Sequence, residues 1–441
     1  MSRGRPMQKF LKNEKVLKDC KIYRMLSAHA TERHLSFHTP GHKVGAWDIT
    51  ELGFSDNLSA PKGCIAEAER DIAEILGAKK SFILTDGSTA GVLSMLYAAK
   101  ALGAKTVAVC EASHKSVFNG CKLLGLTPLV FAPLNGSKMQ NEPTVYALNK
   151  AYGGIFSRAD ALFFTSPDYY GNISDLAGAR EYCDKNGKLL LVDGAHGGHL
   201  HFDKNKYAGA YADLWVDGVH KSLPAFTQGA VVSARTEVLA ERLREGVDIF
   251  RTTSPSYPIM ASGEYAVKYP RNTELERKVR AFQEHPRIYK NGDWTKLCAP
   301  FGEYAFEVEK LLETEGIYPE FCDGSIVMFY LSPATTSEEF EALKSRLETL
   351  FETYPYAFEN EARQIPAPYL LSDNAVTEWV KTDESVGRIC ANNCGLFPPC
   401  TPLLLVGERV TREKVGLLEK SNNVFGVIEG KILVVKETTK E

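Results

Sequence analysis

The sequence predicts an α/β protein whose main sheet is mostly parallel, followed by a smaller α+β domain. Between about residues 60 and 235, short apolar runs of strand length alternate with longer amphipathic stretches of helical period. Such alternation is typical of parallel crossover units, in which helices cover both faces of a sheet. With 441 residues, of which 44% are hydrophobic, the chain is also large enough to bury a sizeable core.

The first predicted helix spans residues 65–76, because Ile65, Ile72 and Leu76 share one helical face and Gly77 follows as a stop signal. The apolar runs expected to form strands are Phe82–Thr85, Thr106–Val109, Leu129–Ala132, Ala161–Thr165, Leu189–Val192, Leu214–Val216 and Ala230–Ser233. Helices are expected between the strands, among them Ala90–Ala101 and Leu176–Asn186.

The chain changes in character after residue 270. A charged stretch rich in turn residues, 270–300, is interpreted as a connection between domains. The elements expected beyond it are helices at Glu303–Glu315, Ser337–Phe351 and near Thr411–Ser421, and strands at Ser325–Leu331, Leu403–Val406, Val424–Ile428 and Ile432–Val435. We therefore predict an N-terminal segment (1–50), a large domain (51–270), and a connecting segment with a small C-terminal domain (271–441).

The composition excludes several classes of protein. A formal net charge of −3, from 52 Lys+Arg and 55 Asp+Glu, gives no basic footprint for nucleic acid. No apolar run approaches the roughly 20 residues that span a bilayer, and the N-terminus lacks the apolar core of a signal peptide. The ten cysteines show no framework spacing, so reduced thiols are expected. These features predict a cytoplasmic protein, large enough to be an enzyme, without nucleic-acid or membrane partners.

Residues Asp86–Gly91 (Asp-Gly-Ser-Thr-Ala-Gly) follow an expected strand and directly precede an expected helix. In an open α/β sheet, ligands bind outside the carboxyl ends of the strands. The hydroxyls of Ser88 and Thr89, together with the free N–H groups of a helix start, would suit a phosphate. The segment is neither a Walker loop nor a nucleophile elbow. Taken alone, it is equally well interpreted as a capped turn.

Three other strand ends carry ionisable side chains, in the segments Ser113-His114-Lys115, Asp193-Gly194-Ala195-His196 and Asp217-Gly218-Val219-His220-Lys221. A lone Lys in a loop is normally solvated, and a lone Asp at a strand end normally forms a turn. Pyridoxal 5′-phosphate, however, needs an amine for a Schiff base, a carboxylate facing its pyridine nitrogen, an anion cradle and a flat group over its ring. Those four groups would be supplied by Lys221, Asp193, Ser88 with Thr89, and His114.

Several motifs occur in a fixed order along the chain. They are His38-Thr39-Pro40-Gly41-His42-Lys43, Asp86–Gly91, Ser113–Ser116, Thr165–Gly171, Leu191–Gly197, His220–Gly229, Thr252–Tyr257 and Phe397–Pro402. Together they resemble the short, wing-less, Gram-positive-type members of the Orn/Lys/Arg decarboxylase family. That resemblance implies the fold-type-I architecture of pyridoxal-phosphate enzymes.

The resemblance also implies a role for each site residue. It implies a Schiff-base link at Lys221, Asp193 on the ring nitrogen, His114 stacked on the ring, Ser88 and Thr89 on the phosphate, and His196 beside the cofactor. His220 would contact the phosphate or take part in proton transfer, and Thr253 and Ser254 would reach the phosphate of a neighbouring subunit. The expected assembly is thus a homodimer with active sites at the subunit interface. The expected reaction is decarboxylation of a basic amino acid (arginine, lysine or ornithine) to CO₂ and an amine that serves as a polyamine precursor.

The chain departs from the family pattern at a few positions. Gly218 replaces a Ser that commonly binds the phosphate, Gly194 replaces a Glu, and Cys400 replaces a Gly. Loss of one phosphate hydrogen bond would weaken cofactor binding by roughly 1.5–3 kcal/mol without abolishing it. Two alternatives stay open: another fold-type-I reaction (amino transfer or elimination) with Arg388 or Arg409 as a carboxylate clamp, and a cofactor-binding paralogue with little turnover.

Substrate recognition and metal binding leave weaker signals. A basic substrate needs an acidic group facing its distal cation, for which Glu408 is the candidate, and His38 is either structural or at the substrate entrance. The cluster His196, His199 and His201 lacks a carboxylate or Cys ligand at a convincing spacing, so no metal is expected.

Overall fold

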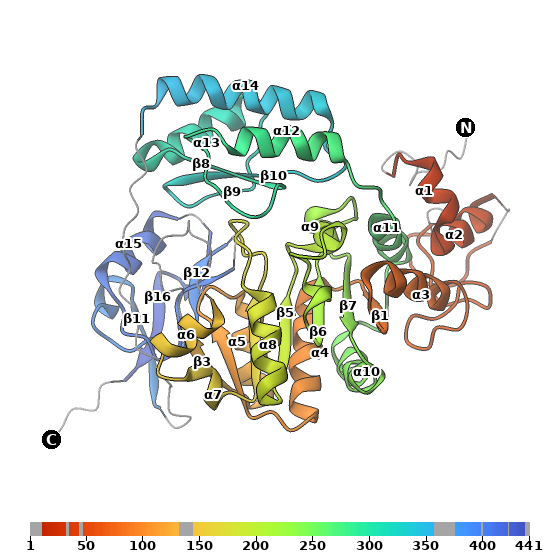
Figure 1. Cartoon of the computed structure of the whole chain (residues 1–441), viewed down its shortest axis with the longest axis horizontal. Helices are drawn as coiled ribbons and strands as arrows, with labels where there is room; N and C mark the ends of the chain where they lie inside the picture. Colours follow the sequence, from red (N-terminus) through yellow and green to blue (C-terminus); the bar gives the residue numbers. More distant parts are fainter. Residues whose placement is uncertain are drawn as a thin grey trace.

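The computed structural model describes residues 11–31, 35–43, 47–131, 144–356, 375–397, 400–421 and 423–436; Ala132, Pro398 and Pro399 of the expected elements and motifs lie outside these ranges. At its centre is a seven-stranded sheet in the order β1-β7-β6-β5-β4-β2-β3 (Figure 1). The strands are β1 (Lys80–Leu84), β2 (Thr106–Cys110), β3 (Thr127–Phe131), β4 (Ala161–Thr165), β5 (Leu189–Asp193), β6 (Leu214–Asp217) and β7 (Ala230–Ala234). Among these seven, β7 alone runs antiparallel to its neighbours, so the other six end at one edge. The mostly parallel sheet predicted from the sequence is confirmed.

Helices cover both faces of this sheet. They are α3 (Cys64–Leu76), α4 (Ser88–Ala101), α5 (Lys115–Leu124), α6 (Val145–Ala151), α7 (Ile155–Arg158), α8 (Leu176–Asn186), α9 (Val219–Ser222), α10 (Glu237–Phe250) and α11 (Tyr257–Val267), with the 3-10 turns η2 (Gly198–Phe202) and η3 (Ala208–Ala210). Two N-terminal helices, α1 (Glu14–Asp19) and α2 (Lys21–Thr31), lie beside α3 and α11 (Figure 1). The glycine that ends α3, Gly77, has the left-handed φ of 70° expected of a helix stop.

The strands are apolar on both faces because each face packs against helices. In β4, Leu162 and Phe164 belong to the cluster formed with α3, α8 and α11. Ala161 and Phe163 point the other way and join the cluster formed with α4, α5 and α10. This alternation of side chains along a strand explains why the sequence shows near-continuous hydrophobic runs here.

The segment 270–300 is more than the connection that the sequence predicts. It contains helix α12 (Thr273–Gln283) and strand β8 (Lys296–Pro300). Because the outer face of α12 is densely charged, its short buried stripe of Leu275, Val279 and Phe282 is easily overlooked. This stripe packs in one cluster with α13 (Ala305–Thr314) and α14 (Ser337–Thr353) over the antiparallel sheet β8-β10-β9, seen in cyan in Figure 1. The other two strands are β9 (Phe321–Cys322) and β10 (Ile326–Tyr330), and η4 (Gly302–Tyr304) precedes α13.

The last part of the chain, in blue in Figure 1, forms a separate cluster. Its sheets are β11-β16-β15 and β13-β12-β14. The elements are β11 (Thr377–Lys381), η5 (Asp383–Ser385), β12 (Cys394–Leu396), β13 (Pro402–Leu404), α15 (Arg412–Lys420), β14 (Val424–Phe425), β15 (Val427–Ile428) and β16 (Lys431–Val435). The prediction of a single strand at 424–428 is therefore wrong. Gly426, with φ 78°, divides it between the two sheets.

Across the described ranges, no helix combines the length and the apolar character needed to span a bilayer.

Candidate active site

A pocket of about 210 Å³ opens at the carboxyl edge of the large sheet. The residues that line it are Gly87, Ser88, Thr89, Val92, Ala112, His114, Ser116, Thr165, Tyr169, Asp193, Ala195, His196, His220, Lys221, Thr227, Gln228 and Thr401. They come from the turns after β1, β2, β4, β5 and β6, from the turn before β7, and from the C-terminal part of the chain. The residues predicted from the strand ends thus lie around one pocket.

Lys221 reaches this pocket from the short helix α9. Its Nζ lies 3.1 Å from Nε2 of His196, which follows β5. Burial lowers the pKa of Lys221, although the carboxylate of Asp193 opposes this effect. Burial, and then the charge of Lys221, also lower the pKa of His196 well below its usual value. The pair is therefore arranged so that the amine can lose its proton and act as a nucleophile.

Of the two aspartates at neighbouring strand ends, only Asp193 lines the pocket. It is the last residue of β5, it is 3% exposed, and its Oδ1 accepts a hydrogen bond of 3.0 Å from the N–H of Ala195. Burial raises the pKa of Asp193, and the charge of Lys221 partly offsets that rise. Asp217, at the end of β6, instead accepts a hydrogen bond of 2.7 Å from the hydroxyl of Tyr207. Asp193 is therefore the carboxylate of the pocket, whereas Asp217 has a structural role.

His114 is the N-cap of α5, and its Nδ1 accepts a hydrogen bond of 3.2 Å from the N–H of Ser116. Burial, followed by the charges of Lys221 and Lys115, lowers the pKa of His114 to about 3. The ring is thus neutral at physiological pH and suited to stacking on another flat ring. His220 is held differently, with its Nδ1 2.8 Å from the carbonyl oxygen of Gly229, and burial lowers its pKa.

The N-terminus of α4 forms one wall of the pocket. Its N-cap is Gly87, with φ 75° and no side chain to cap the first turn. The backbone N–H groups at the start of α4 therefore remain available to a ligand, beside the hydroxyls of Ser88 and Thr89. This is the arrangement expected of a phosphate cradle.

Residues 46–291, more than half of the chain, match the family model described as Orn/Lys/Arg decarboxylase, major domain. The chain belongs to the Orn/Lys/Arg decarboxylase family. It is 28% identical to the uncharacterized protein YaaO of Bacillus subtilis (strain 168), over 94% of this chain and 96% of that protein. It is 27% identical to the arginine decarboxylase of the same organism, over 93% of this chain and 95% of that protein. The solved lysine decarboxylase LdcF of Francisella novicida has the same fold, with a TM-score of 0.71 at 17% identity over 95% of this chain and 81% of that one.

Two departures from the pattern of the Orn/Lys/Arg decarboxylase family have a structural explanation. A Cβ atom at Gly218 would lie 2.6 Å from the carbonyl oxygen of Ala195 and 3.1 Å from Oγ of Ser88, so the turns after β5 and β6 approach too closely for a side chain. Cys400 has a φ of 63°, and its carbonyl oxygen accepts a hydrogen bond of 2.9 Å from the N–H of Lys115. The left-handed backbone that glycine favours is thus retained with a thiol in its place.

Several predicted residues lie outside the pocket lining. Glu408 accepts hydrogen bonds from Lys414 and from the N–H of Leu405. His38 is in the N-terminal segment, where its Nδ1 contacts the carbonyl of Thr39. Thr253 and Ser254 are exposed, next to Thr252, whose N–H donates to Asp86 over 3.3 Å. Their contact with a neighbouring subunit's phosphate stays a prediction.

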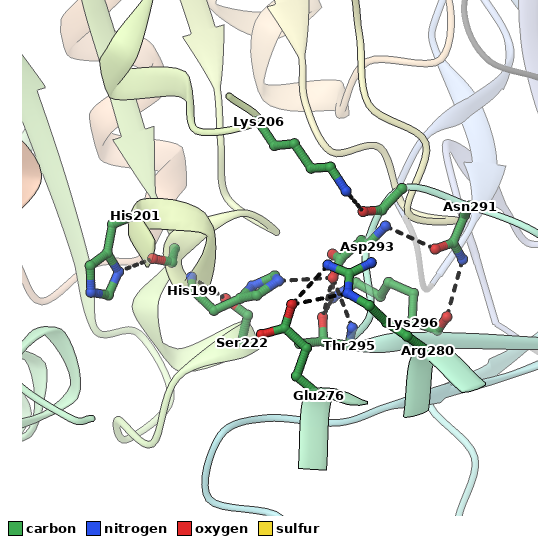
Figure 2. A network of polar contacts seen from close by, with 12 residues as sticks. His199, His201, Lys206, Ser222, Glu276, Arg280, Asn291, Asp293, Thr295 and Lys296 are labelled. Atoms are coloured by element: carbon green, nitrogen blue, oxygen red, sulfur yellow. Dashed lines mark hydrogen bonds and ion pairs between the residues drawn. The ribbon is translucent and has the colours of Figure 1, made fainter. Parts of the chain in front are cut away.

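The two candidate clamp arginines are also outside the pocket. Arg388 donates hydrogen bonds to Glu378 and to the carbonyl of Val435, and Arg409 donates to the carbonyl of Gly387. The described lining contains no arginine at all. The histidines considered as metal ligands diverge as well: His196 faces Lys221, whereas His199 faces Asp293 and His201 contacts the carbonyl of Gly198 (Figure 2).

No sequence signal predicts that residues in and beside the smaller sheet β8-β10-β9 pack against the pocket residues His196 and Tyr169. Tyr330 of β10 packs edge-on against His196, with ring centroids 5.7 Å apart. Glu320, just before β9, accepts a hydrogen bond of 3.1 Å from the hydroxyl of Tyr169, which lines the pocket. These residues are 100 or more positions from the strand ends that suggested the site, and only tertiary packing brings them there.

Proposed function

We propose that this chain is a pyridoxal-phosphate-dependent decarboxylase that converts a basic amino acid into CO₂ and the corresponding amine. One observation carries the proposal. The amine of Lys221 and the buried carboxylate of Asp193 line one pocket with the uncapped start of α4. Amine, carboxylate and anion cradle are three of the four groups that this cofactor requires of a protein, and His114 in the same lining would supply the fourth.

The residues present fit the cofactor. Ser88, Thr89 and the backbone of α4 would hold its phosphate, His114 would stack on its ring, and Asp193 would face its ring nitrogen. Among the described residues, the buried Nδ1 of His196 has no hydrogen-bond partner, which leaves it available to a polar group in the pocket. When bound, the cofactor supplies an electron sink for the bonding electrons left on the α-carbon when CO₂ departs.

The protein's own residues would prepare this chemistry. An ionised Asp193 favours a proton on the facing ring nitrogen, because opposite charges in a buried site stabilise each other. Lys221, with its pKa lowered by burial, offers an unprotonated amine to the cofactor aldehyde and can later carry a proton. His196, 3.1 Å away, orients that amine.

Recognition of the distal cation of the substrate is assigned to Glu320 rather than to Glu408. The side chain of Glu320 is exposed, so an incoming substrate can reach it, and the hydroxyl of Tyr169 connects it to the pocket. Glu408 is already engaged with Lys414. This proposal favours arginine, lysine or ornithine as a class and does not choose among their lengths.

The proposed assembly is a cytoplasmic homodimer in which Thr253 and Ser254 of one subunit contact the phosphate bound by the other. Their exposure beside the turn that begins the phosphate cradle supports this arrangement. The proposal includes no metal, nucleic acid or membrane.

The test is an absorbance spectrum of the purified protein with added cofactor, followed by incubation with each of the three basic amino acids. We expect cofactor absorbance, CO₂ and the matching amine. Keto-acid formation without CO₂ would favour an aminotransferase, and elimination products would favour an elimination lyase. Bound cofactor without any product across a range of pH would favour a paralogue with little turnover.

A further inference from the structure

Lys296, the first residue of β8, is a fully buried lysine close to the candidate active site. Its Nζ donates a hydrogen bond of 3.1 Å to Oγ1 of Thr295 and lies 3.7 Å from Oδ2 of Asp293. It also lies 3.9 Å from the centroid of the Tyr330 ring. A buried ammonium is costly unless it is paired, so the charge of Lys296 depends on Asp293.

Asp293 holds this charge in place (Figure 2). Its Oδ1 accepts hydrogen bonds from the N–H and the hydroxyl of Thr295, over 2.9 and 2.8 Å, and lies 2.8 Å from Nε2 of His199. Burial alone would raise the pKa of Asp293, but His199 and Lys296 hold it well below its usual range. Burial lowers the pKa of Lys296, whereas the ionised Asp293, 3.7 Å away, acts to raise it and so favours the charged ammonium.

The ammonium of Lys296 is separated from Lys221 by two rings. It sits over the face of Tyr330, whose ring packs edge-on against His196 at 5.7 Å. Nε2 of His196 lies 3.1 Å from Nζ of Lys221. The Tyr330 hydroxyl fixes its own ring by donating a hydrogen bond of 2.9 Å to the carbonyl of Tyr169. The ammonium of Lys296 therefore lies behind Tyr330, which packs against the pocket residue His196.

We propose that Lys296 is a positioning residue whose buried positive charge, held behind Tyr330, favours the unprotonated amine of Lys221. The proposal rests on the proposed function only in taking Lys221 as the amine that engages the cofactor. Burial is the largest cause of the lowered pKa of Lys221, and the charge of Lys296 acts in the same direction. It also lowers the pKa of His196.

Other charged and titratable groups face these two lysines. Those around Lys221 are Asp193, His114, His196, His220, Glu320 and Cys400. Those around Lys296 are Asp293, Glu320 and Cys298. The carboxylates near Lys221 favour its protonated form, and the charge of Lys296 acts together with burial to oppose them.

The test compares the full-length chain with Lys296→Met and with the matched control Lys206→Met. Lys206 joins the same two parts of the chain by donating a hydrogen bond of 2.8 Å to the carbonyl of Gly292 (Figure 2). Among the described residues, the cation over the Tyr330 ring is Lys296 and not Lys206. In the cofactor-free chain, the acetylation rate of Lys221 is followed against pH by peptide mass spectrometry. In the cofactor-loaded chain, the pH midpoint of the cofactor absorbance is measured.

In Lys296→Met, we expect the acetylation midpoint of Lys221 to rise by about one pH unit, which is about tenfold less unprotonated amine at a given pH. We expect the absorbance midpoint to rise in the same direction and Lys206→Met to match the wild type. If Lys296 has only a structural role, Lys296→Met will lower the stability of the protein and leave both midpoints unchanged. That result would overturn the proposal. If Lys296→Met does not fold, Lys296→Gln, which can still donate to Thr295, replaces it.

The wild type provides a separate check. A midpoint for Lys221 at or above the unperturbed value of about 10.4 would show that burial and Lys296 do not outweigh the nearby carboxylates, and it would also overturn the proposal. Acetylation requires no cofactor, so failure to bind pyridoxal phosphate would count against the proposed function without affecting this test.

Discussion

Replacing Gly218 with Ser restores the residue that the family pattern expects, and the structure predicts that it harms the protein. A Cβ atom at this position would lie 2.6 Å from the carbonyl oxygen of Ala195, whereas real Cβ contacts essentially never fall below 3.0 Å. The turns after β5 and β6 must therefore separate by at least 0.4 Å. Forced overpacking of this kind costs about 1–3 kcal/mol. The same turns carry Asp193 and Lys221, so the shift also disturbs the cofactor site.

We expect Gly218→Ser to lower the free energy of unfolding by about 2 kcal/mol in urea titrations and to weaken cofactor binding about tenfold or more in absorbance titrations. The control is Gly416→Ser in α15, where an added Cβ would meet no atom within 4 Å, and it should leave both quantities nearly unchanged. The family pattern alone predicts the opposite result, a gain of roughly 1.5–3 kcal/mol from a new hydrogen bond to the phosphate. Tighter binding with unchanged stability would refute the steric argument.

Three further predictions concern Glu320, Asp217 and the subunit interface. Glu320→Gln should raise KM for the basic substrate about tenfold with kcat nearly unchanged, whereas Glu408→Gln should leave KM unchanged; equal effects on KM would contradict the assignment of Glu320. Burial raises the pKa of Asp217 to about 7. The contribution of Asp217 to the free energy of unfolding should thus be greatest below about pH 4, where the unfolded carboxyl is also protonated, and should fall by at most roughly 4 kcal/mol as the pH rises from about 4 to 7. Asp217→Asn should remove this decrease of the free energy of unfolding with pH, measured by urea titration at several pH values. An unchanged pH dependence would count against a raised pKa of Asp217. The Lys221→Ala variant and the Thr253→Ala/Ser254→Ala double variant should each lose turnover at limiting cofactor. Mixing them should restore turnover, because a hybrid dimer has one site with Lys221 from one subunit and Thr253 and Ser254 from the other. No recovery after verified subunit exchange would argue against shared sites.

The elements of the large sheet could be predicted because each carries its own local signal. The strand at Ala161–Thr165 and the helix at Leu176–Asn186 have the predicted bounds. The strand is a short apolar run, and the helix lies between Asp175, which caps its start, and Gly187, whose φ is 60°. Such signals depend only on neighbours in sequence, so these elements can be predicted without knowledge of the fold.

Elements whose formation depends on distant packing could not be predicted in this way. Strand β8 lies in a charged segment and is fully buried because β10 and three helices cover it. At the division, Gly426 leaves room for the backbone of Asn393, whose carbonyl oxygen would lie 2.2 Å from an added Cβ. Neither feature changes the local pattern of apolar residues.

The same distinction applies to the site. Lys221, Asp193 and His114 follow strands of one parallel sheet, so the rule that ligands bind at its carboxyl edge brings them together. Lys296 belongs to a second sheet and Glu320 directly precedes one of its strands, and no spacing rule relates these two residues to the first sheet. Glu408 has the right charge for a substrate contact, but the nearby Lys414 engages its carboxylate.

The most direct test of the central claim is borohydride reduction of the cofactor-loaded protein, followed by mass spectrometry of its peptides. Reduction makes the bond between the cofactor aldehyde and a lysine permanent, so the modified residue can be read from the peptide mass. We predict stoichiometric labelling of Lys221, and loss of labelling, cofactor absorbance and CO₂ release in Lys221→Ala. Labelling of another lysine, or a Lys221→Ala variant that keeps both its absorbance and its turnover, would contradict the account.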